Sequence, residues 1–118
     1  MINILITGGT GFIGIHLVKK LQSLGHNLKL LVRESSNTKP FQNLDNVEYI
    51  IGDVRNIDSL SQAVKNVDVI YHLAANTQIW AKDKAIYEEI NINGSKNIAE
   101  LALQNNVLLI YLNEIQIC

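Results

Sequence analysis

The 118-residue sequence has little of several features, and each absence excludes a class of protein. Its single cysteine, Cys118, cannot form an internal disulfide framework, so a reducing compartment and a cytoplasmic location are expected. Ten basic residues against eleven acidic ones give a formal net charge of -1. Because there is no basic excess and no Lys/Arg cluster, neither nucleic acid nor a membrane surface is an expected partner.

Long hydrophobic runs are also lacking. The longest, Val107–Leu112, is far shorter than the roughly 20 residues that a membrane-spanning helix needs. Met1–Ile6 is apolar, but no basic segment precedes it and no small-residue cleavage site follows, so no signal peptide is predicted. Hydrophobic residues nevertheless make up 47% of the chain, which is enough to build the core of one globular domain and excludes intrinsic disorder.

Short apolar runs alternate with helical patterns along the chain. Because the runs are continuous rather than alternating, they are typical of strands buried on both faces of a parallel sheet. The predicted strands are Ile2–Ile6, Leu28–Val32, Val47–Ile51, Val69–Leu73 and Val107–Leu112. The predicted helices are Phe12–Leu24, Asp58–Val64 and Ala85–Asn105, and Ser35–Asn46 is predicted as a surface loop.

In the first predicted helix, the apolar residues recur at helical spacing and predict the buried face. They are Ile13, Leu17, Leu21 and Leu24. The alternation of strands and helices predicts an α/β fold, a Rossmann-type doubly wound parallel sheet in the order 3-2-1-4-5. Its ligand crevice is expected at the carboxyl ends of the first and fourth strands, where the strand order reverses.

A glycine-rich turn lies between the first predicted strand and the first predicted helix. It is either Gly-x-Gly-x-x-Gly from Gly9 or Gly-x-x-Gly-x-x-Gly from Gly8. Glycines here allow a tight reversal, a close approach of the backbone to a pyrophosphate, and close packing of helix on strand. The start of the helix offers amide groups and a positive dipole end to phosphates. The turn therefore predicts dinucleotide binding, and a P-loop is excluded because no Gly-Lys-Ser/Thr follows.

Thr7–Gly14 resembles the N-terminal signature of the extended short-chain dehydrogenase/reductases, which include NAD-dependent epimerases and dehydratases. Further matches follow in the family's order. They are Gly52-Asp53-Val54-Arg55, His72-Leu73-Ala74-Ala75, and the helical set Asn91, Gly94, Ser95 and Asn97. Arg33 and the segment Ile79–Asp83 are most similar to the dihydroflavonol-reductase-like branch.

The resemblance implies cofactor contacts along three segments. The set comprises Gly8, Thr10, Gly11, Phe12, Ile13 and Gly14 near the pyrophosphate, Asp53 and Val54 near the adenine, and Leu73, Ala74 and Ala75 near the nicotinamide ribose. Asn91 is expected either to hold the loop after the fourth strand or to contact the active site. Two alternatives stay open, since Asp53 fits a helix cap or turn and Asn91 fits an ordinary helix surface.

The choice between NAD and NADP is expected to depend on the end of the second strand. Val32 occupies the place where NAD-preferring relatives carry an aspartate, and Arg33 follows it. A guanidinium there pairs with a 2′-phosphate through two parallel hydrogen bonds, which favours NADP. The alternative is NAD, because a register shift of one would place Glu34 on the ribose. Lys39 is interpreted as a solvated loop lysine.

No second type of site is predicted. His72 lies in an apolar run and is interpreted as a hydrogen-bonded core histidine rather than a general base. His16, His26 and His72 do not have the spacing of metal ligands, so no metal site is expected.

The family's catalytic Tyr-x-x-x-Lys pair is absent from these 118 residues. Four positions after Tyr49, Tyr71, Tyr87 and Tyr111 stand Asp53, Ala75, Asn91 and Ile115. After the fifth strand, where the family has a Ser or Thr, this chain has Asn113-Glu114. The hypothesis is that residues 1–118 form the incomplete NAD(P)-binding domain of a larger enzyme, without the substrate-binding part.

Two functions follow from this hypothesis. The first is the cofactor-binding portion of an oxidoreductase or epimerase that transfers hydride between a nicotinamide and a carbonyl or hydroxyl of a small molecule or nucleotide sugar. The second is a non-catalytic dinucleotide-binding sensor or interaction module. No turnover is expected from these residues alone, and the apolar fifth strand, as an edge, predicts self-association.

Overall fold

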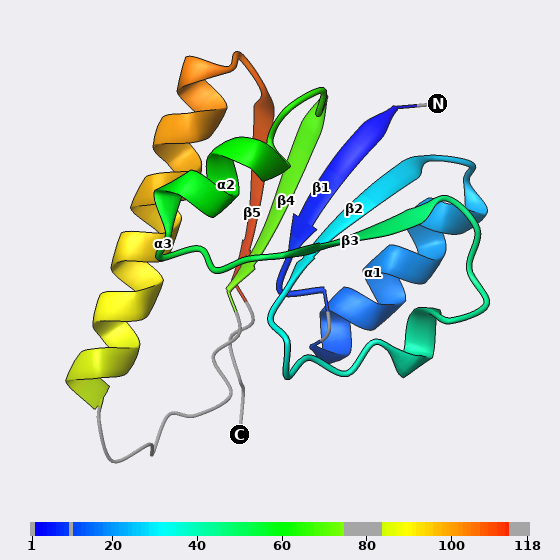
Figure 1. Cartoon of the computed structure of the whole chain (residues 1–118), viewed down its shortest axis with the longest axis horizontal. Helices are drawn as coiled ribbons and strands as arrows, with labels where there is room; N and C mark the ends of the chain where they lie inside the picture. Colours follow the sequence, from blue (N-terminus) through cyan, green and yellow to red (C-terminus); the bar gives the residue numbers. More distant parts are fainter. Residues whose placement is uncertain (1, 10, 75–83, 114–118) are drawn as a thin grey trace.

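The computed structural model describes residues 2–9, 11–74 and 84–113, and its strands form one parallel five-stranded sheet (Figure 1). The strand order is β3-β2-β1-β4-β5, which confirms the predicted doubly wound topology. The strands are β1 (Asn3–Thr7), β2 (Asn27–Val32), β3 (Val47–Ile51), β4 (Val69–Ala74) and β5 (Leu108–Asn113). The helices are α1 (Phe12–Ser23), α2 (Ile57–Ala63) and α3 (Lys84–Gln104), with a short 3-10 helix, η1, over Lys39–Phe41.

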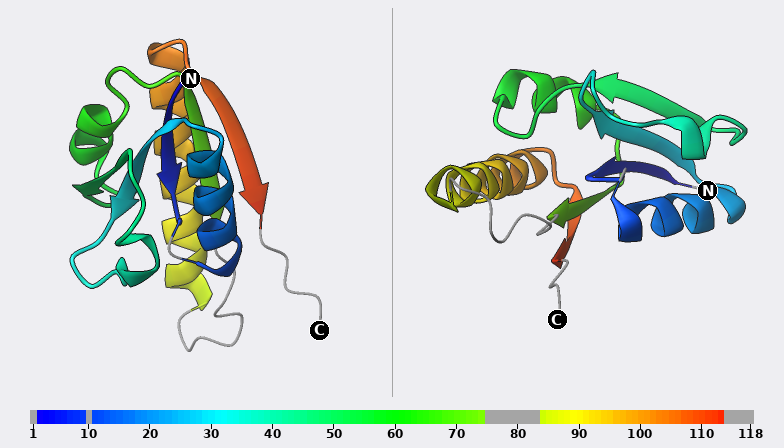
Figure 2. Two further views of the ribbon diagram at one scale, coloured as in Figure 1. Left: turned by 90° about the vertical axis from the view of Figure 1, so that its right-hand side faces the viewer. Right: turned by 90° about the horizontal axis from the view of Figure 1, so that it is seen from below.

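Helices cover both faces of the sheet, with α1 on one side and α2 and α3 on the other (Figure 2). Successive side chains of a strand point to opposite faces, so each central strand contributes to two cores. In β1, Ile4 and Ile6 pack on the α1 side, whereas Leu5 packs on the side of α2 and α3. All three are almost completely buried, as continuous apolar runs predict.

The predicted inner face of α1 is wrong in part. Ile13 and Leu24 are 44% and 58% exposed, whereas Val18 is completely buried. Gly14 fixes this rotation, because it is buried against the turn that precedes the helix. Positions four and seven residues beyond it, Val18 and Leu21, then face the sheet, and Ile13 turns outward.

The two outer strands are less buried than their apolar sequences predict. Ile51 of β3 is 59% exposed and Leu108 of β5 is 61% exposed. The physical reason is their position, because β3 and β5 are the edges of the sheet and only partly lie under helices. The prediction of burial on both faces therefore holds for the central strands only.

The segment predicted as a surface loop, Ser35–Asn46, is anchored to the core. It contains η1, and Phe41 at the end of η1 is 1% exposed and packs with Ile4 and Leu28. The aromatic side chain thus contributes to the core on the α1 side of the sheet, although it comes from the segment between β2 and β3.

The long helix α3 packs on the sheet through its second half. Ile98, Leu101 and Ala102 are buried there. None of the helices in the described ranges combines the length and the apolar character that crossing a bilayer requires.

Candidate dinucleotide-binding site

A glycine corner joins the carboxyl end of β1 to the start of α1. Gly8 directly follows β1 and has a φ of +75°, a left-handed conformation that favours glycine. A Cβ atom on Gly8 would also collide with the carbonyl oxygen of Leu73 in β4. Glycine is therefore required where the ends of β1 and β4 meet, which is the predicted position of the crevice.

The start of α1 packs tightly on this corner, and its N-cap residue has no side chain. A Cβ atom on Gly14 would lie 2.6 Å from the Gly8 carbonyl oxygen. Gly11, the N-cap residue, has no side chain to accept a hydrogen bond from the first-turn amides, and no acidic residue lies in the first turn. The positive end of the helix dipole thus meets no negative side chain from its own helix. This arrangement suits an anionic ligand.

The structure brings together part of the predicted pyrophosphate and nicotinamide sets. Gly8 and Leu73 touch, and Ile13 lies exposed in the first turn of α1. Phe12 begins α1 and Ala74 ends β4, although their side chains are not described. Thr10, Ala75 and Ile79–Asp83 lie outside the described residues.

The predicted adenine and ribose residues follow the neighbouring strands β2 and β3. Arg33 comes directly after β2, and the Ser36 amide donates to its carbonyl oxygen at 2.9 Å, which closes a tight turn. Beside this turn, the Gly52 amide donates to the Val32 carbonyl oxygen at 2.9 Å. Gly52, which directly precedes Asp53, is therefore held against the end of β2. Parallel strands end at one edge of the sheet, so Arg33 and Asp53 share that edge with the glycine corner.

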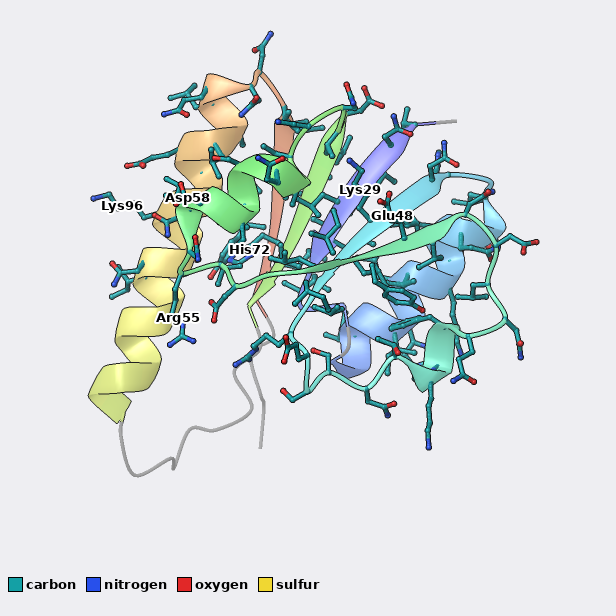
Figure 3. The ribbon with its side chains drawn as sticks, in the orientation of Figure 1. Lys29, Glu48, Arg55, Asp58, His72 and Lys96 are labelled. Atoms are coloured by element: carbon teal, nitrogen blue, oxygen red, sulfur yellow. The ribbon has the colours of Figure 1, made fainter. Side chains whose placement is uncertain are left out.

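Asp53 forms a turn and an ion pair with Arg55. Figure 3 shows Arg55 in the loop that leads from β3 into α2. The Arg55 amide donates to Asp53 Oδ1 at 2.9 Å, and the Arg55 Nη2 atom donates to Oδ2 at 2.6 Å. The helix cap is Asn56, whose Oδ1 accepts from the Asp58 and Ser59 amides. Of the alternatives open for Asp53, the structure therefore contains the turn and not the cap.

The charge environment of Asp53 is positive. The hydrogen bond from the Arg55 side chain lowers the pKa of Asp53, against an opposing effect of burial, and the charge of Arg33 lowers it further. Arg33 is therefore close enough for its charge to act on the segment Asp53–Arg55, which we call the adenine loop after its predicted role. The carboxylate is ionised at neutral pH and available as a hydrogen-bond acceptor.

Residues of α3 contact the adenine loop directly. Asn97 Nδ2 donates to the Val54 carbonyl oxygen at 3.0 Å, and Gly94 lies against the Val54 side chain. The sequence matched Gly94 and Asn97 to the family's helical pattern, but it did not indicate what Asn97 binds. The partner lies 43 positions away in the sequence, so only the folded chain identifies it. Asn91 lies in the same helix, with its side chain outside the described residues.

His72 is a buried, hydrogen-bonded residue of the sheet, as predicted. Its Nδ1 atom is hydrogen-bonded to Thr7 Oγ1, and its Nε2 atom lies 3.2 Å from Ser95 Oγ of α3. Figure 3 shows it between the sheet and α3. Burial lowers the pKa of His72, so the neutral imidazole is favoured, and one hydroxyl donates to it while the other accepts from it. Within the described ranges, no group of His, Cys, Asp and Glu side chains is arranged to hold a metal ion.

A comparison with protein families gives a match to the NAD dependent epimerase/dehydratase family over residues 4–113. The chain belongs to this family. A relative in Synechocystis sp., named "Putative dihydroflavonol 4-reductase", is 36% identical over 97 residues, which cover 82% of this chain and 28% of the relative. The resemblance to the dihydroflavonol-reductase-like branch is thereby confirmed.

Solved structures of the family contain the same fold. The crystal structure of gox2253 matches with a TM-score of 0.84 and 35% identity, covering 94% of this chain and 34% of that one. The Bordetella bronchiseptica enzyme WbmG, solved in complex with NAD, matches with a TM-score of 0.80. At 24% identity, over 93% of this chain and 36% of WbmG, that likeness shows the fold alone. The chain thus spans about a third of the length of these relatives.

Proposed function

We propose that the glycine corner binds the pyrophosphate of a nicotinamide dinucleotide. The single observation that carries this proposal is the glycine turn itself: Gly8 is left-handed and packed against Leu73, and Gly11, the N-cap residue of the helix that follows, has no side chain to cover the backbone. A phosphate group at this position accepts hydrogen bonds from backbone amides and interacts favourably with the helix dipole. The same fold holds NAD in WbmG.

The residues along this edge have distinct roles in the proposal. The adenine lies beside Asp53 and Val54, and the nicotinamide ribose lies beside Leu73, Ala74 and Ala75. A bound nicotinamide supplies a site for hydride transfer to or from a carbonyl or hydroxyl of a small molecule or nucleotide sugar. The chain's part is to orient the dinucleotide and to keep the nicotinamide end near the β4 terminus.

NADP is the proposed coenzyme, with NAD as the alternative. Arg33 is exposed after the end of β2, and its positive charge acts on the adenine loop. A guanidinium in that place pairs with the 2′-phosphate that distinguishes NADP from NAD.

Gly11→Asp is the sharpest test of phosphate binding at this corner. Gly11 has φ -76° and ψ 176°, an extended conformation that any residue adopts, so aspartate fits there as an N-cap. The cap is expected to raise the free energy of unfolding by only a few tenths of a kcal/mol, because glycine is itself an acceptable N-cap, while its charge repels the phosphates. Titration of NADPH and NADH, followed by coenzyme fluorescence, is expected to give at least about a tenfold loss of affinity.

Gly11→Ser is the matched control, because it caps the helix without adding charge. Because it also adds a side chain where the backbone approaches the phosphates, it measures the steric part of any loss, and Gly11→Asp is expected to bind the coenzymes more weakly than Gly11→Ser. Phosphate binding at α1 is wrong if Gly11→Asp folds and binds both coenzymes as tightly as the unmodified chain.

Two further parts of the proposal concern the whole chain. Self-association through β5 is proposed because the strand is an edge without a charged residue, and Leu108 on it is 61% exposed. A cytoplasmic location stays a prediction from the single cysteine.

A further inference from the structure

We propose that Asn97 and Gly94 of α3 are positioning residues for the adenine half of the dinucleotide. They act through Val54 and do not contact the ligand themselves. The inference rests on the proposed function, because it assumes that the adenine loop lies beside the adenine. Its own evidence is the contact of Asn97 and Gly94 with Val54, a contact that the sequence alone did not indicate for Asn97.

Asn97 holds the backbone of the loop. Its Nδ2 atom donates to the Val54 carbonyl oxygen at 3.0 Å, and the side chain is half-buried. The two residues that flank Val54 in the sequence are bonded to each other, since the Asp53 carboxylate accepts from the Arg55 amide. The Val54 carbonyl is therefore held by α3, while Asp53 and Arg55 hold each other on either side of it in the sequence.

Gly94 sets how close the loop lies to α3. A Cβ atom on Gly94 would lie 2.6 Å from Val54 Cγ2 and 3.1 Å from Val54 Cβ. Gly94 occurs inside a helix, where glycine is normally less stable than alanine. The close approach to Val54 gives this glycine a function, because any side chain would push the loop away from the helix. Gly94 and Asn97 lie three residues apart, on the same face of α3.

The consequence concerns the dinucleotide. Both contacts act on Val54, which follows Asp53 directly in the sequence, so a displaced Val54 also moves the Asp53 carboxylate that would recognise the adenine. The glycine corner is formed by β1, α1 and β4 and does not include these contacts. Loss of the Asn97 amide should therefore weaken binding of the adenine half and leave the nicotinamide half unchanged.

Calorimetric titration of the full chain with ADP-ribose and with nicotinamide mononucleotide tests this inference. Asn97→Ala is expected to weaken ADP-ribose binding about tenfold and to leave nicotinamide mononucleotide unchanged. Asn97→Asp keeps the shape of the side chain but lacks the Nδ2 donor, so it should show the same loss of ADP-ribose affinity. If Asn97 acted only through packing, Asn97→Asp would bind ADP-ribose as the unmodified chain does. Asn93→Ala is the matched control, because Asn93 is exposed one turn earlier on the same helix.

Each outcome separates the inference from the proposed function. If the unmodified chain binds neither ligand, the proposed function is wrong and the inference falls with it. If the unmodified chain binds ADP-ribose and the folded Asn97 variants bind it equally well, only the inference is wrong. Equal losses for both ligands would identify a general structural role and also overturn it. Gly94→Ala provides a variant that keeps every hydrogen-bonding group, and it should reproduce the selective loss.

Discussion

At the scale of single residues, Arg33 is the side chain on which the proposed preference for NADP depends. It follows the buried Val32, is exposed, and contributes to lowering the pKa of Asp53. Arg33→Ala is expected to weaken NADPH binding by about tenfold or more, because a charge-assisted pair with the 2′-phosphate is lost. NADH has no 2′-phosphate, so its affinity should change little. Fluorescence titration with both coenzymes measures the difference.

Lys39→Ala is the control for a general effect of positive charge. Lys39 is also an exposed cation of the segment after β2, and it was interpreted as a solvated lysine. The preference for NADP is wrong if the unmodified chain binds both coenzymes equally, and the role of Arg33 is wrong if Lys39→Ala has the same effect.

At the scale of elements, His72 connects β1, β4 and α3 through two hydroxyl groups. Burial lowers its pKa below the ordinary value of 6.5. The folded state therefore favours the neutral ring, and the stabilisation is complete above pH 6.5 and is lost as the pH falls from 6.5 toward the folded pKa. The stabilisation from the lowered pKa of Asp53 is complete above its ordinary value of 3.8 and is lost only below it, so the two pH effects are separate.

His72→Phe tests this connection. The variant leaves the Thr7 and Ser95 hydroxyls without the imidazole, so the free energy of unfolding at pH 7 should fall by about 1–3 kcal/mol. Its stability should also depend less on pH between 7 and about 5 than that of the unmodified chain. Urea denaturation at both pH values measures this. Thr7→Val keeps the imidazole, so its stability should still depend on pH. If the stability of His72→Phe depended on pH as strongly as that of the unmodified chain, His72 would not be the group responsible.

The sequence predicted the elements more reliably than their orientations. Strand order, the glycine corner and the interpretation of His72 follow from local patterns, and the structure confirms them. The rotation of α1 could not be predicted, because it depends on the contact of Gly14 with Gly8 rather than on apolar spacing. The ion pair of Asp53 with Arg55 and the bond from Asn97 to Val54 depend on side-chain geometry and on distant elements. Helical spacing carries no signal for such contacts.

At the scale of the whole molecule, the two edges of the sheet differ in how they are protected. β3 carries the charged residue Glu48 (Figure 3), whereas β5 contains neither a charge nor a proline. Charged side chains and prolines are the usual means by which edge strands avoid pairing with other chains. An uncharged edge can also pair with its own copy about a two-fold axis without repulsion between like charges. β5 is therefore the edge at which two copies are expected to meet.

Light scattering coupled to size-exclusion chromatography over a range of concentrations measures this association. The unmodified chain should exceed the monomer mass, increasingly so at higher concentration, and Leu108→Lys should return it toward the monomer because a charge then lies on β5. Leu103→Lys is the matched control, since Leu103 is 84% exposed but belongs to α3. An unmodified chain that stays monomeric at every concentration would contradict the prediction. An equal effect of both substitutions would assign the association to general surface hydrophobicity rather than to the strand edge.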